Sequence, residues 1–287
     1  MQLVVLSGKG GTGKTTVAAA ITRLAACPLA VDCDVDAANL HLLLGMRDLS
    51  SEDFSGSKVA ELDDSRCVRC NRCGSVCRFD AIEYGMVDQL SCEGCGACVY
   101  ACPYDALALV DQTIGQVFLT STTWGHLSRA EMYPGADGSG KLVTRVREQA
   151  AEIADRASSP TILDGPPGIG CPVIATLTGC DAALLVLEPS YSSQHDFLRL
   201  LQLLHKFDIK TYACINRHDL SPDNCRELQQ VCEQKGVPIV GLIPFDPLVM
   251  EAHRQLKSIL DFEDSPAAEA IRQIWANLSK MIGVDQQ

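Results

Sequence analysis

The chain has 287 residues, of which 47% are hydrophobic, 5% aromatic and 21% charged, as is ordinary for a soluble α/β protein with one core and a small module. Its net charge of −12 argues against nucleic acid and anionic membrane surfaces as partners, because both attract basic faces. We expect a cytoplasmic protein without a membrane span, since no apolar stretch is long enough and no cleavage signal opens the chain.

A glycine-rich loop lies between a strand predicted over residues 3–7 and a helix predicted over residues 17–26. This order, with the ending Gly-Lys-Thr, is typical of a P-loop that binds ATP through backbone N–H groups and a helix N-terminus. We expect Lys14 on the β- and γ-phosphates and the Thr15 hydroxyl on Mg²⁺. The nucleotide-binding residues predicted here are Gly8, Gly10, Gly11, Thr12, Gly13, Lys14, Thr15 and Thr16.

Acidic residues follow the second predicted strand, residues 29–33. A carboxylate beside a γ-phosphate can orient or deprotonate the attacking water, and Asp32, Asp34 and Asp36 all stand at or just after the end of this strand. Asp32 is expected to be structural or supporting, and Asp36 to be a solvated charge at the start of the next helix.

Eight cysteines form two runs of one spacing, C-x2-C-x2-C-x3-C, and the second repeats the first 25 positions later. This spacing is typical of ferredoxins with two [4Fe–4S] clusters, in which the fourth cysteine of each run binds the other cluster. Zinc sites favour two C-x2-C pairs, and disulfides are not expected with 15 cysteines and no secretory signal. Arg78 stands where the first run usually has proline, which removes no ligand. The predicted ligands are Cys67, Cys70, Cys73 and Cys102 for cluster 1, and Cys92, Cys95, Cys98 and Cys77 for cluster 2.

A strand predicted over residues 161–163 ends at Asp164, the Walker B position, where a carboxylate holds Mg²⁺ through water. Gly168 follows two prolines and can bring its N–H group to the γ-phosphate. Three further strands are predicted over residues 183–187, 211–215 and 239–243.

The alternation of strands and helices predicts an α/β fold, a doubly wound and mostly parallel sheet of the P-loop NTPase kind. A small α+β module of the bacterial ferredoxin type is inserted in it, over residues 61–112, so the ATPase domain comprises residues 1–60 and 113–287. A glycine-rich loop over residues 134–140 precedes a helix predicted over residues 141–157. Two more helices are predicted, over residues 195–207 and from Ser265-Pro266 onward.

The loop Gly8-Lys9-Gly10-Gly11-Thr12-Gly13-Lys14-Thr15 is a deviant Walker A loop, and in it the chain resembles the MinD-like P-loop ATPases. The resemblance implies an ATP-dependent homodimer in which Lys9 reaches the partner's nucleotide. It also implies that Asp34 lies in switch I as the catalytic carboxylate, which orients or deprotonates the attacking water, and that Gly168 lies in switch II. The adenine-binding residues that it implies are Asn216, Pro244 and Asp246.

With the cysteine runs included, the whole chain is similar to MinD-superfamily ATPases that contain an inserted ferredoxin domain. Such proteins are associated with metal-cofactor and iron–sulfur protein assembly. Cys171 follows Asp164 at the spacing with which the distant nitrogenase iron protein holds a cluster between subunits. A buried small hydrophobic side chain is the alternative for Cys171. The remaining cysteines show no ligand spacing: Cys27, Cys33, Cys180, Cys214, Cys225 and Cys232.

The leading hypothesis is an ATP-gated redox protein, an Mg²⁺-dependent ATPase that turns over slowly without its partner. ATP would close the homodimer and move or expose two [4Fe–4S] clusters toward a redox or metal-cofactor protein. An iron–sulfur carrier or scaffold is the alternative. A positioning ATPase of the cell-division or partition kind is a third interpretation, against which the acidic charge weighs.

Overall fold

The computed structural model describes residues 1–26, 29–45, 47–154 and 160–284. They divide into two compact units. The nucleotide unit comprises Met1–Ser51, Val117–Glu131 and Ser139–Gln287, and the cysteine unit comprises Glu52–Gln116 and Met132–Gly138. The predicted insert, residues 61–112, lies inside the cysteine unit, which also takes in residues on both sides of it and the separate segment 132–138.

A nine-stranded sheet runs in the order β11-β10-β9-β1-β8-β2-β7-β6-β3. The pairs from β11 to β7 are all parallel, which confirms the predicted mostly parallel sheet. Its strands are β1 Gln2–Leu6, β2 Leu29–Asp32, β3 Arg47–Leu62, β6 Leu107–Ser121, β7 His126–Met132, β8 Thr161–Asp164, β9 Ala182–Leu187, β10 Lys210–Asn216 and β11 Ile239–Ile243.

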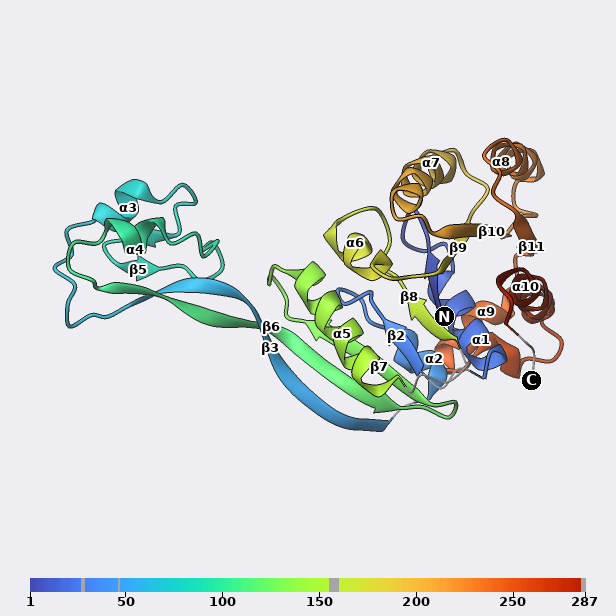
Figure 1. Cartoon of the computed structure of the whole chain (residues 1–287), viewed down its shortest axis with the longest axis horizontal. Helices are drawn as coiled ribbons and strands as arrows, with labels where there is room; N and C mark the ends of the chain where they lie inside the picture. Colours follow the sequence, from blue (N-terminus) through green and yellow to red (C-terminus); the bar gives the residue numbers. More distant parts are fainter. Residues whose placement is uncertain (27–28, 46, 155–159, 285–287) are drawn as a thin grey trace. The chain divides into compact units, whose positions relative to one another are not determined.

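Helices cover both faces of this sheet in the nucleotide unit, with α5, α6 and α7 on one face and α1, α9 and α10 on the other (Figure 1). The strands are apolar on both sides for this reason: Leu3 and Val5 of β1 belong to the core that contains α1 and α10, and the alternating Val4 and Leu6 are also fully buried. The helices are α1 Lys14–Leu24, α2 Leu40–Leu44, α5 Ser139–Ile153, α6 Cys171–Leu177, α7 Tyr191–Lys206, α8 Pro222–Gln234, α9 Leu248–Arg254, the 3-10 turn Ile259–Asp261 and α10 Pro266–Ile282.

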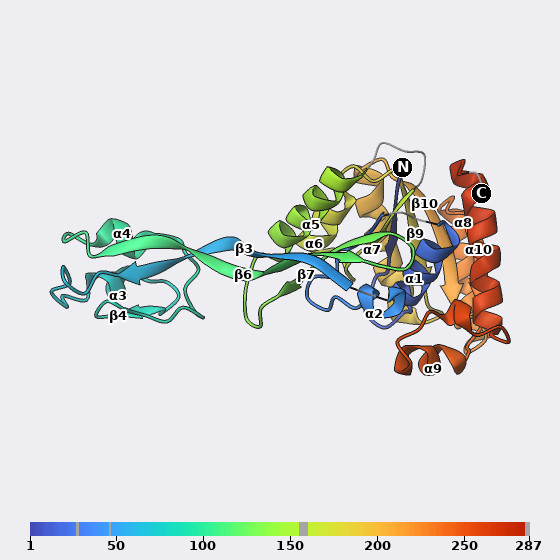
Figure 2. The same cartoon turned by 90° about the horizontal axis from the view of Figure 1, so that it is seen from below.

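The predicted strands and helices of the nucleotide unit form, with bounds that differ by a few residues. The end of the helix predicted over 141–157 lies outside the described residues. Two neighbouring strands, β3 and β6, were not predicted from the sequence, and Figure 2 shows them side by side. Most residues of β3 are exposed, so the strand lacks the apolar alternation that a sheet with one buried face imposes. Each of these strands contributes residues to both units.

The cysteine unit is built from the sequence repeat. Its elements are α3 Arg72–Val76, α4 Ala97–Ala101 and the antiparallel pair β4 Ile82–Glu83 and β5 Met86–Val87. The backbone repeats with the sequence, because positive φ angles recur 25 positions apart at Asn71 and Gly96 and at Asp80 and Asp105. The buried core of the unit is small and consists of Ala60, Cys73, Ile82, Cys98 and Leu107.

Candidate functional site

The predicted nucleotide-binding residues surround one pocket of the nucleotide unit, at the carboxyl ends of the strands. The P-loop forms its floor and α1 begins there at Lys14. Predicted residues that line the pocket are Gly10, Gly11, Gly13, Lys14, Thr15, Thr16, Asp34, Asn216, Pro244 and Asp246. Gly8, Thr12 and Gly168 do not line it, and Asp164 contacts it only through Lys14.

Lys14 lies between two carboxylates. Its Nζ is 2.7 Å from Oδ1 of Asp164 and 3.6 Å from Oδ2 of Asp34. Burial alone would lower the pKa of Lys14, but the charges of Asp164 and Asp34 outweigh burial and raise it. Lys14 is therefore kept charged by the two carboxylates, at the place where a phosphate group and Mg²⁺ would bind.

The chemistry of the site fits Mg²⁺. Oδ2 of Asp164 is buried and accepts no hydrogen bond from the described residues, so a carboxylate oxygen is free for a metal-bound water. The Thr15 hydroxyl lies 3.5 Å from Nζ of Lys14, close enough for both groups to face one ligand. Burial raises the pKa of Asp34, the predicted catalytic carboxylate, while Lys14 opposes that rise.

Asp32 anchors the segment that carries Asp34. Its carboxylate accepts backbone N–H groups of Asp34, Asn39 and Leu40, each at 3.1 Å. Burial, followed by the charge of Asp164, raises the pKa of Asp32 to about 7. These contacts agree with the expectation that Asp32 is structural.

Two of the three predicted adenine residues, Asn216 and Asp246, already make hydrogen bonds within the fold. The Asn216 side chain donates to the carbonyl of Thr12 at 2.8 Å and so braces the P-loop. The carboxylate of Asp246 accepts from Ser265 Oγ and the backbone N–H group of Ala267 at the start of α10, and from the backbone N–H group of Leu248 at the start of α9. Asp246 thus lines the pocket while its oxygens are already engaged in the fold.

Two pocket residues were missed by the sequence analysis. His253 of α9 lies 2.8 Å from the Thr16 hydroxyl through Nε2, and burial lowers the pKa of its imidazole. Phe245, which is 48% exposed, offers an aromatic surface in the same pocket. A Pro-x-Asp stretch marks the position of Phe245, but no local signal marks His253, 237 positions from Thr16.

Two glycines outside the pocket position its loops. Gly8 lies under α7, where an added Cβ would stand 2.3 Å from Cβ of Asp196. Gly168 has φ +89° and donates its N–H group to the Ser7 carbonyl at 3.1 Å. Delivery of that N–H group to a γ-phosphate requires this hydrogen bond to break.

Lys9 points to groups of its own chain. Its Nζ is 3.0 Å from Oε2 of Glu188, 3.1 Å from Ser190 Oγ and 3.5 Å from Ser192 Oγ. Arg217 pairs with the other oxygen of Glu188 at 2.9 Å. Burial acts to raise the pKa of Glu188, but hydrogen bonds from Lys9 and Arg217 outweigh burial and lower it. A reach toward a second subunit requires Lys9 to leave Glu188.

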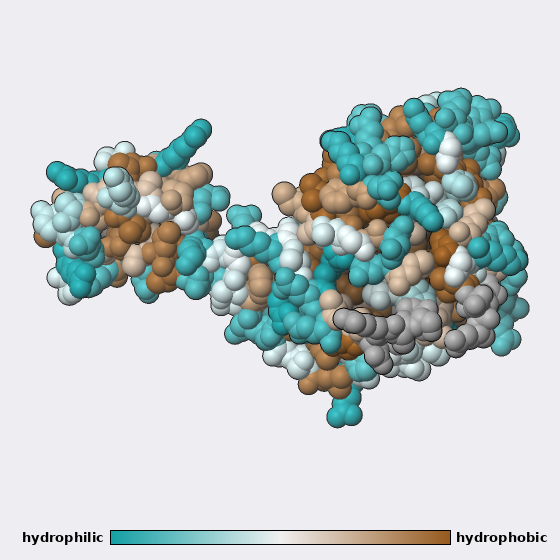
Figure 3. Space-filling model, in the orientation of Figure 1, coloured by the Kyte–Doolittle hydropathy of each residue, from teal (hydrophilic) through white to brown (hydrophobic). Residues whose placement is uncertain are grey.

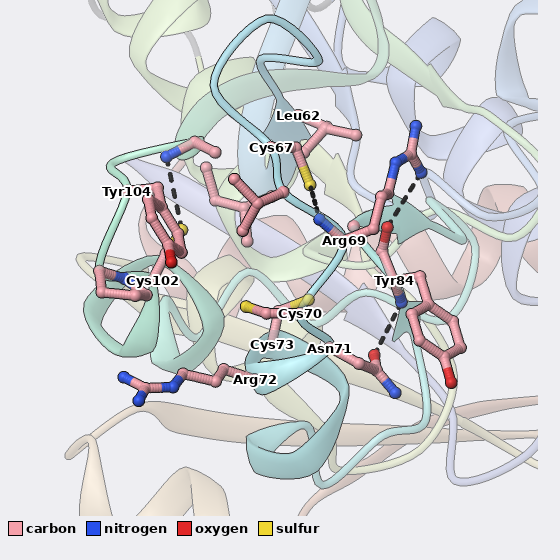
Figure 4. Close-up of a pocket in the computed structure, with 15 residues that line it drawn as sticks. Leu62, Cys67, Arg69, Cys70, Asn71, Arg72, Cys73, Tyr84, Cys102 and Tyr104 are labelled. Carbon is pink, nitrogen blue, oxygen red and sulfur yellow. Dashed lines mark hydrogen bonds between the residues drawn. The ribbon is translucent and has the colours of Figure 1, made fainter.

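Four of the eight predicted cluster ligands line one cavity of the cysteine unit. Figure 4 shows the sulfur atoms of these residues facing a common space, three from the stretch that leads into α3 and one from the end of α4. They are Cys67, Cys70, Cys73 and Cys102, the set assigned to cluster 1 from the spacing. We call this space the first cavity.

The other four line a second cavity of the same unit. They are Cys77, Cys92, Cys95 and Cys98, the set assigned to cluster 2. Apart from the cysteines, mainly apolar side chains such as Ile82 and Leu109 surround it. The fold therefore brings the fourth cysteine of each run to the cavity of the other run, as the crossed assignment requires.

The donor set of each cavity fits an iron–sulfur cluster. Backbone N–H groups donate to sulfur at Cys67, Cys77 and Cys102, an arrangement that tunes cluster thiolates. Within the described residues no group of three or more His, Cys, Asp or Glu side chains converges on a single metal ion. Four thiols spread around a cavity suit a multi-iron core better than one ion.

The other cysteines lie apart from these cavities. Cys171 is exposed at the start of α6, and so it is not the buried side chain that the alternative assumed. Cys33, Cys180, Cys214, Cys225 and Cys232 are buried, and Cys27 lies outside the described residues. Burial raises the pKa of the Cys214 and Cys232 thiols to about 12, which keeps them protonated and inert.

The chain matches one protein family, and it is similar to several known proteins in sequence and to solved structures in fold. The family described as CobQ/CobB/MinD/ParA nucleotide binding domain matches residues 3–259. An uncharacterized protein of Methanocaldococcus jannaschii is 32% identical, with 98% of each chain covered. An iron–sulfur cluster carrier protein of Pyrococcus abyssi is 23% identical over 95% of this chain and 83% of its own length. The septum site-determining protein MinD from Pyrococcus horikoshii, solved with Mg-ADP, shares the fold with a TM-score of 0.60 at 19% identity, covering 98% of this chain and 97% of its own.

No helix in the described part of the chain is both long and apolar enough to cross a membrane.

Proposed function

The chain belongs to the CobQ/CobB/MinD/ParA nucleotide-binding family, and we propose that it is an ATPase that couples its nucleotide state to electron transfer by two iron–sulfur clusters. The predicted P-loop family is thereby confirmed, while the inserted ferredoxin domain stays a prediction. One observation carries the proposal: eight cysteines, matched in spacing to a two-cluster ferredoxin, line two cavities in the crossed sets that such a module requires.

The nucleotide half of the proposal rests on the P-loop pocket. Lys14 would exchange its contacts with Asp164 and Asp34 for the β- and γ-phosphates. Asp164 and Thr15 would then hold Mg²⁺, and Asp34 would orient the attacking water. Lys14, Thr15 and Asp34 line the pocket, Asp164 contacts Lys14, and all four residues belong to the nucleotide unit.

We further propose that ATP closes a homodimer through Lys9. The lysine is bound to Glu188 and to two serines of its own chain, and this network competes with any contact to a second subunit. A nucleotide's γ-phosphate in a facing subunit offers Lys9 a stronger anionic partner than a shared carboxylate.

The redox half rests on the thiols. A [4Fe–4S] cluster in each cavity would supply one-electron storage. Cys70 and Cys95 are exposed, and so each cavity has an edge that a redox or metal-cofactor protein could approach.

Switch I has a short covalent route to the strand that enters the cysteine unit. Asp32 holds the backbone of Asn39 and Leu40, and α2 and then β3 follow directly. At the start of β3, Asp48 pairs with the buried Arg129 of β7 at 3.0 Å. Changes at the phosphates can therefore alter the strand on which the cysteine unit is built.

The test combines metal analysis with turnover. Protein purified without oxygen should contain about eight irons and eight sulfides per chain. Asp34→Asn should lower ATP hydrolysis by about 10²–10⁴-fold and leave iron unchanged. Reduction of the redox partner protein should require ATP in the wild type, whereas in the Asp34→Asn variant ATP should not change it. Bound zinc without iron, or partner reduction that proceeds equally without nucleotide, would contradict the proposal.

A cluster carrier is the second candidate, and the exposed thiols of Cys70 and Cys95 favour it because an acceptor can reach them. The Pyrococcus abyssi relative, an iron–sulfur cluster carrier protein, supports the same candidate. Transfer of iron and sulfide to an apo-acceptor, with equal loss from this chain, would replace electron transfer by cluster delivery.

A further inference from the structure

The two cysteine cavities form an internal comparison, since each position in one has an equivalent 25 residues away in the other. Their empty volumes are about 340 and about 350 Å³. Cys73 and Cys98 are each 8% exposed, and the equivalent Cys70 and Cys95 are both exposed. Size and burial therefore do not distinguish the cavities.

Charge does distinguish them. Arg69 and Arg72 line the first cavity, and no carboxylate lines it. The equivalent residues of the second run are Gly94 and Ala97, which carry no charge. A carboxylate, Glu93, lines the second cavity without any basic residue. The arginines of the first cavity and the glutamate of the second therefore both make the first cavity the more positively charged of the two.

Neighbouring charges moderate this difference without cancelling it. Arg69 pairs with Asp64 at 2.5 Å, so its charge is partly balanced. Arg72 has no ion pair among the described residues and supplies the unbalanced positive charge. Arg78 follows Cys77, a ligand of the second cavity, but its side chain is exposed and does not line that cavity.

Backbone hydrogen bonds to sulfur occur at both cavities and do not distinguish them. In the first cavity Cys67 accepts the N–H group of Arg69 at 3.5 Å, and Cys102 accepts that of Ala106 at 3.4 Å. In the second cavity Cys77 accepts the N–H group of Ala81 at 3.4 Å, and Cys98 accepts that of Val99. The difference between the cavities is therefore one of side-chain charge.

We propose that Arg69 and Arg72 at the first cavity, with Glu93 at the second, give a cluster in the first cavity the higher reduction potential of the two. The inference rests on the proposed function, because both cavities must hold clusters. Reduction adds one negative charge, which the arginines stabilise at the first cavity and Glu93 destabilises at the second. A one-electron donor protein would lose one electron and a cluster held in the first cavity would gain it, with no proton transferred.

The experiment is an anaerobic redox titration of the full chain with dithionite, followed by electron paramagnetic resonance and visible absorption. Two variants replace residues of one run by those at the equivalent positions of the other. The first is Arg69→Gly with Arg72→Ala, matching Gly94 and Ala97, and the second is Glu93→Val, matching Val68. Glycine suits position 69, because Arg69 has φ +56° there. Arg226→Ala, at an exposed ion pair of the nucleotide unit, is the control. Iron and sulfide are measured for every variant first.

We expect two one-electron steps in the wild type. The arginine variant should lower the upper step alone, Glu93→Val should raise the lower step alone, and the control should move neither. Fully loaded proteins whose steps stay fixed, or an arginine variant that moves the lower step, would overturn the ordering and leave the proposed function standing. Protein without iron would remove the proposed function and the ordering with it.

Discussion

The nucleotide unit and the cysteine unit stabilise their folds in opposite ways. The nucleotide unit buries apolar strands between two layers of helices, and its buried charges pair with one another, as Lys14 does with Asp164. The cysteine unit has five buried hydrophobic residues in its core, two of them cysteines. Figure 3 shows hydrophobic side chains on the surface of this unit. Among its large side chains, Tyr100 is 96% and Leu90 83% exposed.

With the proposed clusters bound, this contrast identifies the cysteine unit as the part of the molecule that depends on a cofactor. A unit with so few buried apolar side chains gains much of its stability from metals or cross-links. Thiols that face two cavities offer such cross-links. The nucleotide unit has no such need, because its core is complete without ATP.

Iron removal should have the largest effect, and it should unfold the cysteine unit while the nucleotide unit stays folded. Chelation under reducing conditions should reduce amide-exchange protection over residues 52–116 almost to that of an unfolded chain, because the cluster bonds replace a missing core. Protection in β1, β8 and β9 should persist. Hydrogen-exchange mass spectrometry measures both, and full protection of the cysteine unit without iron would break the comparison.

Lys14→Ala should have the next largest effect, confined to the nucleotide unit. Loss of the lysine leaves Asp164 and Asp34 buried without a cation, which costs about 3–5 kcal/mol of unfolding free energy. ATP binding should be lost as well.

Lys9→Ala is the matched control in the same loop, since the Lys9–Glu188 pair is partly exposed and should contribute about 0–1 kcal/mol. Urea unfolding and equilibrium binding of a fluorescent ATP analogue check both variants. Equal losses of unfolding free energy in the two variants would show that the buried Lys14 ion pairs stabilise the fold no more than the exposed Lys9 pair does.

A pair of glycines tests packing under the P-loop. Gly8→Ala places a Cβ 2.3 Å from Cβ of Asp196 and should cost about 1–3 kcal/mol by overpacking. Gly10→Ala meets no atom within 4 Å and should change stability by less than about 0.5 kcal/mol. Thermal unfolding compares the two variants. A Gly8→Ala protein as stable as the wild type would contradict the prediction, because it would mean that α7 can shift away from the new Cβ at no cost.

His253 should give the smallest effect, visible as a dependence on pH. Burial lowers the pKa of His253 below its usual 6.5, so its contribution to stability is complete above pH 6.5 and is lost as pH falls through the folded pKa. His253→Gln should flatten the stability of the nucleotide unit in that window. Urea titrations from pH 7.5 to pH 5 check this, and identical slopes in both proteins would contradict it.

Local patterns predicted much of the molecule. The P-loop residues came from one glycine-rich stretch, and the structure gathers most of them at one pocket. The strand β3 escaped prediction because most of its residues are exposed and it lacks an apolar period, and its neighbour β6 was not predicted either. The function of Asp246 was also not readable locally, since its oxygens bind the start of α10 nearly twenty residues later, as the contact with Ser265 shows.

The sequence by itself determined the chemistry of the sites, because ligand types and short spacings are local properties of the chain. Thiols at fixed intervals and a lysine after a glycine loop carry that information without any fold. Only the tertiary structure decided which distant groups complete each site: His253 beside Thr16, Glu188 beside Lys9, and Arg72 beside one cavity while Glu93 lines the other. Coulomb and hydrogen-bond energies depend on distance in space, which separation along the chain does not fix.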